Sequence, residues 1–147
     1  MEPNEALIRQ WFEEVWNQQK PEAIDNLYAA DGVSYGMLEL GAPMHGPEPW
    51  KAVQAAFCQA LPDLKVEIQE VFTRGDSVAV RFSAWGTNTG PFQGIPASNK
   101  RVTVEGMCTA VVRDGQLIEG QNTLDMLGLL QQIGAVPSIA EIAAAKK

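Results

Sequence analysis

The sequence predicts an α+β domain in which three helices are followed by a run of antiparallel strands and one more helix. Three observations lead to this prediction. Apolar residues recur every three or four positions up to Pro62, they alternate with polar residues after it, and a helical pattern returns after Asp125. Strands and helices do not alternate along the chain, so a parallel sheet covered on both faces is not expected. An antiparallel sheet with helices on one face curls around them and leaves an apolar pocket on its concave side.

The helical half is divided by prolines and by a polar turn. A broad apolar stripe over residues 7–16 predicts the first helix. Pro21 suits the first turn of a second, shorter helix, which carries Tyr28 and which the Asp31-Gly32 pair ends. Pro47 begins a third helix in the same way, and this helix extends to the next proline.

Patterns with a period of two predict the strands that follow. They cover residues 66–69 and 78–83, and the Gly75-Asp76 pair between them is typical of a hairpin turn. The loop over residues 86–96 is long for a hairpin connection and mixes glycine with apolar residues. It is interpreted either as a lid at the mouth of a pocket or as a wide hairpin end that covers the core.

The last part of the sheet is predicted most strongly. A long strand over residues 102–112 and an antiparallel partner over 117–124 flank the Asp114-Gly115 pair, which suits a turn that needs positive φ at both positions. Asp125 then has the place of an N-cap for a fourth helix, which Gly134 ends.

Length and composition predict one folded domain. The chain has 147 residues, of which 46% are hydrophobic, and we assign the domain to residues 1–134. Residues 135–147 form a tail that carries a capping box and is either a short helix or a frayed end. The formal net charge of -7 repels phosphate, so neither nucleic acid nor an anionic membrane is expected as a partner.

Cysteine and histidine usage leads to two further expectations. Cys58 and Cys108 are too few for a disulfide scaffold, so we expect reduced thiols in a cytoplasmic protein. His45 is the single histidine, and no pair of residues has the spacing of metal ligands, so no metal site is expected. Motifs that bind nucleotide phosphates are missing as well, and no cofactor is expected.

Three stretches of the chain resemble one known family. They are the opening helix pair, residues 11–33, the long loop with its following strand, residues 86–106, and the last hairpin with its helix, residues 111–134. Together with the turn HGPEPW at residues 45–50, they resemble the SnoaL-like polyketide cyclases, which lie in the nuclear-transport-factor-2-like superfamily with the ketosteroid isomerases. The resemblance implies a cone-shaped, strongly bent antiparallel sheet wrapped around three helices, as in the cystatin-like and ketosteroid-isomerase-like folds. It also implies a mostly hydrophobic cavity and a homodimer or larger homo-oligomer formed through the outer face of the sheet.

The resemblance further implies a reaction. Cyclases of this type, ester cyclases included, close a ring by intramolecular aldol condensation without a metal or cofactor, using an Asp in the last strand to move the proton next to a carbonyl. In this sequence that position is Asn122, and a histidine of the family falls on Cys108. An amide cannot carry a proton, although it can donate a hydrogen bond to a carbonyl or enolate oxygen.

The chemistry therefore needs another proton carrier if the protein is an enzyme. Tyr35, Glu39, Asp125 or a bound water are the candidates, while Glu119 is expected to point outward by strand alternation. Tyr35 and Asp125 have structural alternatives, a half-buried tyrosine with its hydroxyl in water and a helix N-cap, and Glu39 is a candidate as a carboxylate at the pocket rim. The residues predicted to contact a small hydrophobic ligand are Cys108, Trp11, Trp50, Phe57, Phe92 and Ile118.

Two functions follow from the sequence. The first is a cyclase or isomerase that acts on a small hydrophobic carbonyl compound by cofactor-free proton transfer at carbon, with Asn122 polarising an oxygen atom. The second is a protein that binds such a compound in a hydrophobic pocket without converting it, because the usual acid is absent.

Overall fold

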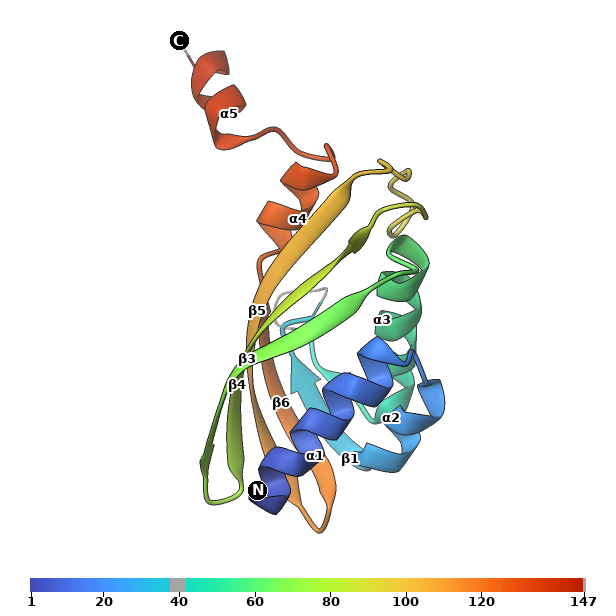
Figure 1. The fold of residues 1–147 in the computed structure, drawn as a ribbon, viewed down its shortest axis with the longest axis vertical. Helices are drawn as coiled ribbons and strands as arrows, with labels where there is room; N and C mark the ends of the chain where they lie inside the picture. The colour runs from blue at the N-terminus through green and yellow to red at the C-terminus, as the bar shows by residue number, and fades with distance from the viewer. Residues whose placement is uncertain (38–41, 147) are drawn as a thin grey trace.

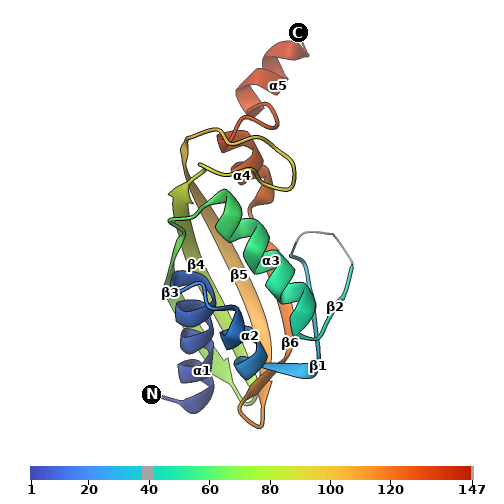
Figure 2. The same ribbon diagram turned by 90° about the vertical axis from the view of Figure 1, so that its right-hand side faces the viewer.

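A computed structural model describes residues 1–37 and 42–146, and in them helices pack against one face of a six-stranded sheet (Figures 1 and 2). Within these residues the elements are, in chain order, α1 (Pro3–Trp11), the π-helix η1 (Phe12–Asn17), α2 (Pro21–Leu27), β1 (Tyr28–Tyr35), β2 (Met44–His45), α3 (Pro47–Ala60), β3 (Lys65–Arg74), β4 (Ser77–Thr87), β5 (Arg101–Arg113), β6 (Gln116–Leu124), α4 (Met126–Gln132) and α5 (Ile139–Ala145).

The sheet has the strand order β2-β1-β6-β5-β4-β3. Its pairs are antiparallel apart from β1 and β6, which run parallel. Figure 1 shows the long strands bending around the helices, and Figure 2 shows α1, α2 and α3 on the same side of the sheet. The predicted α+β class with a curled sheet around three helices is confirmed.

Strand β1 was not predicted, and the second helix is shorter than expected. Helix α2 ends at Leu27, and Tyr28 begins the strand that contains the Asp31-Gly32 pair. Asp and Gly are rare in strands, so local propensity favours a turn there. Pairing with β6 overrides this propensity, and the ring of Tyr28 covers Gly32, where a Cβ would lie 2.6 Å from Tyr28 Cε1.

The predicted first helix is an α-helix in its first part and a π-helix in its last part. The predicted stripe spans α1 and then η1, in which the Gln18 N–H donates to the Glu13 carbonyl over 2.9 Å. The buried side chain of Gln54 reaches across from α3 and donates to the carbonyl of Val15 over 2.8 Å. This bond satisfies a carbonyl near the end of the helix and ties α3 to η1.

Both predicted hairpins and the predicted N-cap are present. Arg74 pairs with Ser77 around the first turn, and Asp114 and Gly115 have φ of 52° and 74° at the second. The side chain of Asp125 accepts from the Gly128 N–H over 2.9 Å, which caps α4.

The loop over residues 86–96 is tied to the end of α3. Asn88 is 1% exposed and its amide donates to the carbonyls of Ala60 and Gly90, while its carbonyl oxygen accepts from the Ser98 N–H. The Gly90 N–H also donates to Ala60. These bonds favour the interpretation of the loop as a hairpin end that covers the core.

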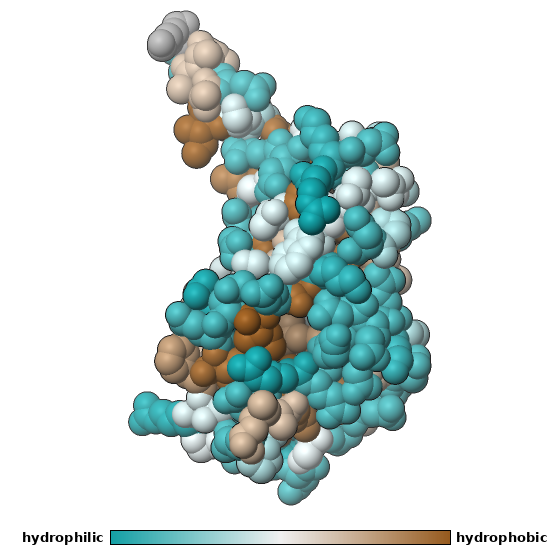
Figure 3. All heavy atoms as spheres, in the orientation of Figure 1, coloured by the Kyte–Doolittle hydropathy of each residue, from teal (hydrophilic) through white to brown (hydrophobic). Residues whose placement is uncertain are grey.

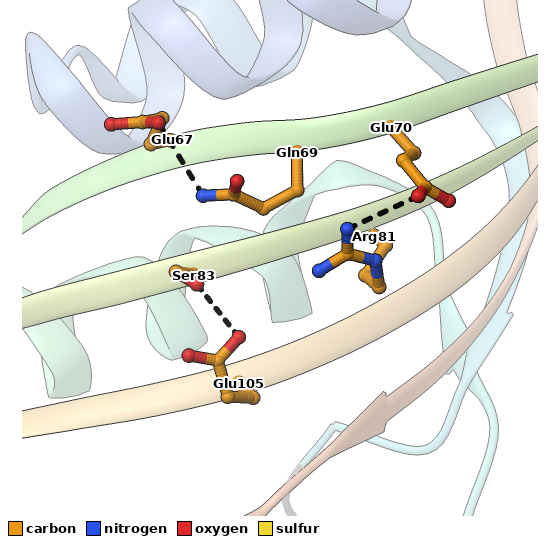
Figure 4. Close-up of polar contacts among 6 residues, drawn as sticks. All are labelled: Glu67, Gln69, Glu70, Arg81, Ser83 and Glu105. Carbon is orange, nitrogen blue, oxygen red and sulfur yellow. Dashed lines mark hydrogen bonds and ion pairs between the residues drawn. The ribbon is translucent and has the colours of Figure 1, made fainter.

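The outer face of the sheet is mostly polar (Figure 4). Ser83 donates to Glu105 over 2.7 Å, and Arg81 forms an ion pair with Glu70 at 3.2 Å. Phe72 and Met107 are exposed on the same face, at 66% and 58%. The outer sheet therefore offers a small apolar area among paired charges.

Helix α5 extends beyond the sheet at one end of the molecule (Figures 1 and 2). Ser138 and Glu141 form the predicted capping box, and α5 contains no buried residue among those described. Figure 3 shows a largely hydrophilic face with apolar side chains in a recess near its middle and on α5. No helix within the described ranges is long and apolar enough to cross a bilayer.

Candidate functional site

A cavity lies between the helices and the concave face of the sheet. Aromatic side chains from both layers contribute to its wall, together with aliphatic residues and residues of β4, β5 and β6. The aromatic residues that line it are Trp11, Phe12, Trp16, Tyr28, Trp50, Phe57 and Phe82. Such a wall suits a flat, apolar molecule.

Most of the ligand-contacting residues predicted from the sequence lie on this wall. Trp11 and Trp50 pack edge to face with ring centroids 5.3 Å apart, and Phe57 and Cys108 line the same space. Their contact with a ligand remains a prediction.

Phe92 and Ile118 are not among the described residues that line the cavity, which corrects their predicted place. Phe92 packs behind Phe57, with ring centroids 5.3 Å apart, and belongs to the loop that covers the core. Ile118 is the extra residue of a bulge in β6, since Val111 pairs with Glu119 and Val112 pairs with Leu117. The bulge shifts the alternation, so Leu117 takes the inward place.

Asn122 and Cys108 are direct cross-strand partners, and both line the cavity. The Asn122 amide donates to the backbone carbonyl of Tyr35 over 3.0 Å, which fixes its orientation. Burial raises the pKa of the Cys108 thiol to about 12, so this thiol is neutral at physiological pH. Cys108 is thus a wall residue and not a thiolate nucleophile.

The predicted proton carriers do not meet at Asn122. Tyr35 is half-buried and is absent from the cavity lining that the structure describes. Its chain neighbour Ser34 belongs to that lining. Asp125 is occupied as the N-cap of α4. Glu39 lies outside the described residues.

A polar cluster that the sequence did not predict lies on the same wall. The hydroxyl groups of Tyr28 and Ser34 are 2.6 Å apart, and Trp50 Nε1 donates to Ser34 Oγ over 3.3 Å. Tyr28 and Ser34, hereafter the hydroxyl pair, are 2% and 0% exposed, and both line the cavity. Both residues belong to β1, so the sequence could have indicated them only if that strand had been recognised.

Glu119 is the one carboxylate among the described residues that line the cavity. The residue is exposed, which agrees with the outward direction expected from the sequence, yet it is among the residues that line the cavity. Burial raises the pKa of Tyr28, and the negative charge of Glu119 raises it further. Glu119 is therefore close enough to influence a group inside the cavity.

Comparison with known proteins places the chain in a family. The family of SnoaL-like polyketide cyclases matches residues 6–133. The chain belongs to this family. The cavity and its polar wall are therefore interpreted as those of a family member.

Individual relatives are distant in sequence and close in fold. The chain is 24% identical to the aklanonic acid methyl ester cyclase DnrD of Streptomyces peucetius over 132 residues, 87% of this chain and 88% of the relative. A protein from Jannaschia sp. CCS1 described as a SnoaL-like polyketide cyclase superposes with a TM-score of 0.81 at 26% identity, over 92% of this chain and 94% of the other. A protein with a ketosteroid isomerase-like fold from Catenulispora acidiphila gives a TM-score of 0.71 at 22% identity, over 87% and 92%.

Proposed function

We propose that this protein is a cyclase that closes a ring in a small hydrophobic carbonyl compound by proton transfer at carbon, without a cofactor. The observation that carries the proposal is the cavity itself, an aromatic space with its polar groups gathered beside Asn122 on strands β1 and β6. Membership of the cyclase family supports the same reaction class.

The proposed reaction is an intramolecular aldol condensation. A base removes the proton from the carbon next to a carbonyl, and the resulting enolate carbon forms a bond to a second carbonyl carbon of the same molecule. The second carbonyl becomes an alkoxide and takes up a proton. Asn122 donates a hydrogen bond to the enolate oxygen, a contribution on the order of 10² to 10³ in rate for donors of this kind.

We assign the proton transfer to Glu119. Tyr35 and Asp125 are not among the described lining residues, whereas Glu119 is the one carboxylate that is. A positioned carboxylate contributes about 10² to 10⁴ in rate as a general base. Its exposure lets it exchange the proton with water.

The absence of a buried acid from the described wall favours a second candidate function. Apart from Glu119, the described lining has no carboxylate and no histidine. A protein with such a wall would bind a hydrophobic carbonyl compound and release it unchanged.

Turnover of a named substrate distinguishes the two functions. We would incubate the wild-type protein, Glu119→Gln and Asn122→Asp with aklanonic acid methyl ester, the compound in the name of the curated relative, and measure the cyclised product, an isomer of the substrate, by liquid chromatography. A cyclase gives product with the wild type and at least about 10²-fold less with Glu119→Gln. No product from the wild type, together with product from Asn122→Asp, would identify a binding protein on a cyclase scaffold.

We also propose a homodimer formed through the outer face of the sheet, as the resemblance implies. Exposed Phe72 and Met107 support this face as the contact. Sedimentation of the wild type should give the mass of a dimer, and Met107→Lys should lower the association constant. A wild-type monomer at all concentrations would overturn the assignment.

A further inference from the structure

The hydroxyl pair has one hydrogen more than its hydrogen bonds within the protein use. Tyr28 and Ser34 each carry one hydroxyl hydrogen, and Trp50 contributes one N–H. The Trp50 hydrogen goes to Ser34 Oγ, and one hydroxyl hydrogen lies in the 2.6 Å contact between the two oxygens. Whichever hydroxyl donates in that contact, the other hydroxyl hydrogen has no acceptor in any bond between described residues.

The spare donor lies in a place where an unmet hydrogen bond is costly. Ser34 is 0% exposed and Tyr28 is 2% exposed, and the surrounding wall is aromatic and aliphatic. Burial raises the pKa of Tyr28, so the phenol keeps its proton at neutral pH and remains a donor. A buried donor of this kind gains free energy when a ligand supplies an acceptor.

Asn122 supplies a second donor beside the first. One hydrogen of its amide is used by the Tyr35 carbonyl, which leaves the other hydrogen available. The Ser34 hydroxyl and the Asn122 amide both lie beside Gly120. A Cβ built on this glycine would lie 2.9 Å from Ser34 Oγ and 3.6 Å from Asn122 Nδ2. The missing side chain keeps this space open between the two donors.

We infer that one carbonyl oxygen of the ligand lies over Gly120 and accepts hydrogen bonds from both Asn122 and the hydroxyl pair. The inference rests on the proposed function in assigning a carbonyl ligand, and it adds the second donor and the place of the oxygen. The ligand class is a flat apolar ketone, since the rest of the wall is apolar and aromatic. Two donors on one oxygen favour the enolate over the ketone, because charge develops on that atom.

The spare hydrogen leads to an unusual pattern of mutants. In Tyr28→Phe the Ser34 hydrogen remains free to donate, and in Ser34→Ala the Tyr28 hydrogen does. Each single variant therefore keeps a hydroxyl donor. The double variant Tyr28→Phe/Ser34→Ala removes both hydroxyl groups but leaves the Trp50 N–H without its acceptor, so only the triple variant Trp50→Phe/Tyr28→Phe/Ser34→Ala removes every donor of the cluster. The effects of the three substitutions are then far from additive.

The test compares two probes that differ in the carbonyl oxygen, 2-acetylnaphthalene and 2-isopropenylnaphthalene. We would measure both dissociation constants and the carbonyl stretching frequency of the bound ketone. The wild type is expected to bind the ketone about tenfold more tightly than the alkene, and the bound carbonyl should absorb at lower frequency than in an apolar solvent. The single variants should keep this preference within about threefold, and the triple variant should lose most of it.

Tyr35→Phe is the matched control, because it removes a hydroxyl group from the same strand at a residue that is not among the described cavity lining. It should keep the preference for the ketone. Equal binding of both probes by the wild type, no binding of the ketone, or an undiminished preference in the triple variant would each overturn the inference. The readout is independent of turnover: a ketone preference without cyclised product would reject the proposed enzyme alone, and cyclised product without the preference would reject the two-donor site alone.

Discussion

Asn122 Nδ2 lies 3.0 Å from the backbone carbonyl oxygen of Tyr35, so a side chain of the cavity wall joins β6 to the end of β1. An amide can donate this bond at every pH. A carboxylate at the same position would face the carbonyl with an acceptor oxygen, and the two would repel. A carboxyl group there can donate to the carbonyl only when it is protonated. Partial burial also favours the protonated form and so raises the pKa of the group.

The variant Asn122→Asp should therefore lose stability as the pH rises. The pKa of the introduced carboxyl should be higher in the folded protein than in the unfolded chain, where it is about 3.9. Between these two pKa values the folded state binds more protons, so the free energy of unfolding falls with increasing pH. Urea denaturation should show a loss of about 1–3 kcal/mol relative to the wild type at pH 7.5 and a smaller loss at pH 4.5.

Gln121→Glu provides the control for the added charge. Gln121 is exposed on the neighbouring position of β6, with its side chain on the opposite face. This variant should follow the wild type within about 0.5 kcal/mol at both pH values. If Asn122→Asp were as stable relative to the wild type at pH 7.5 as at pH 4.5, the amide bond to Tyr35 would not have the assigned role.

The contrast between Asn122 and Tyr28 shows what could be predicted from the sequence. Asn122 lies on a strand that follows an Asp-Gly turn and precedes an N-cap, so the strand was predicted correctly, and the place of Asn122 in the cavity was implied by the resemblance. Tyr28 and Ser34 lie on a strand with Asp, Gly and Ser, whose stability comes from the parallel pairing with β6, far away in the chain. Local patterns do not contain that pairing.

Ile118 was predicted to line the cavity and does not, and the cause differs from that for Tyr28. Alternation assigns every second residue to one face, and a single inserted residue reverses the assignment beyond it. The bulge between Val111 and Val112 is opposite Ile118, and it brings Leu117 onto the wall instead. The sequence has no glycine or proline there that would indicate a bulge.

Cys108 should resist alkylation in the folded protein. With a pKa of about 12, its thiolate fraction at pH 8 is about 10³-fold lower than that of an unfolded thiol. Iodoacetamide at pH 8 should modify Cys108 only when the protein unfolds, as measured by peptide mass spectrometry. Above about pH 8.5 the unfolded chain releases this proton first, so the thiol lowers the stability of the folded protein as the pH rises toward 12.

Cys58 is the internal comparison for that experiment. Burial raises the pKa of Cys58 as well, and it lies on α3 away from the described cavity wall. Cys58 should react faster than Cys108, and Cys108→Ala should leave the Cys58 rate unchanged. Equal rates for the two thiols in the folded protein would contradict the assigned burial of Cys108.

Asn88→Ala should destabilise the fold strongly for a loop substitution. It removes three side-chain hydrogen bonds of a residue that is 1% exposed, and it leaves the carbonyls of Ala60 and Gly90 and the Ser98 N–H without these partners. We expect a loss of about 2–4 kcal/mol in the free energy of unfolding. Thr89→Ala, at the exposed next position, should change it by less than about 0.5 kcal/mol. Similar values for the two variants would show that the loop is not held by Asn88.

Removal of α5 should leave the domain intact. Helix α5 has no buried residue, and its exposed Ile139 and Ile142 do not join the core of the described chain. A chain that ends at Pro137 keeps the bond from Gln131 Nε2 to the Pro137 carbonyl, as well as the backbone bonds from residues 135 and 136 to Leu130. Because truncation removes no buried residue and no residue of the apolar core from the described monomer, its midpoint of thermal unfolding should stay within about 2 °C of the full chain. A larger decrease at high protein concentration that vanishes on dilution would show instead that α5 packs against a second copy, since only an intermolecular contact depends on concentration.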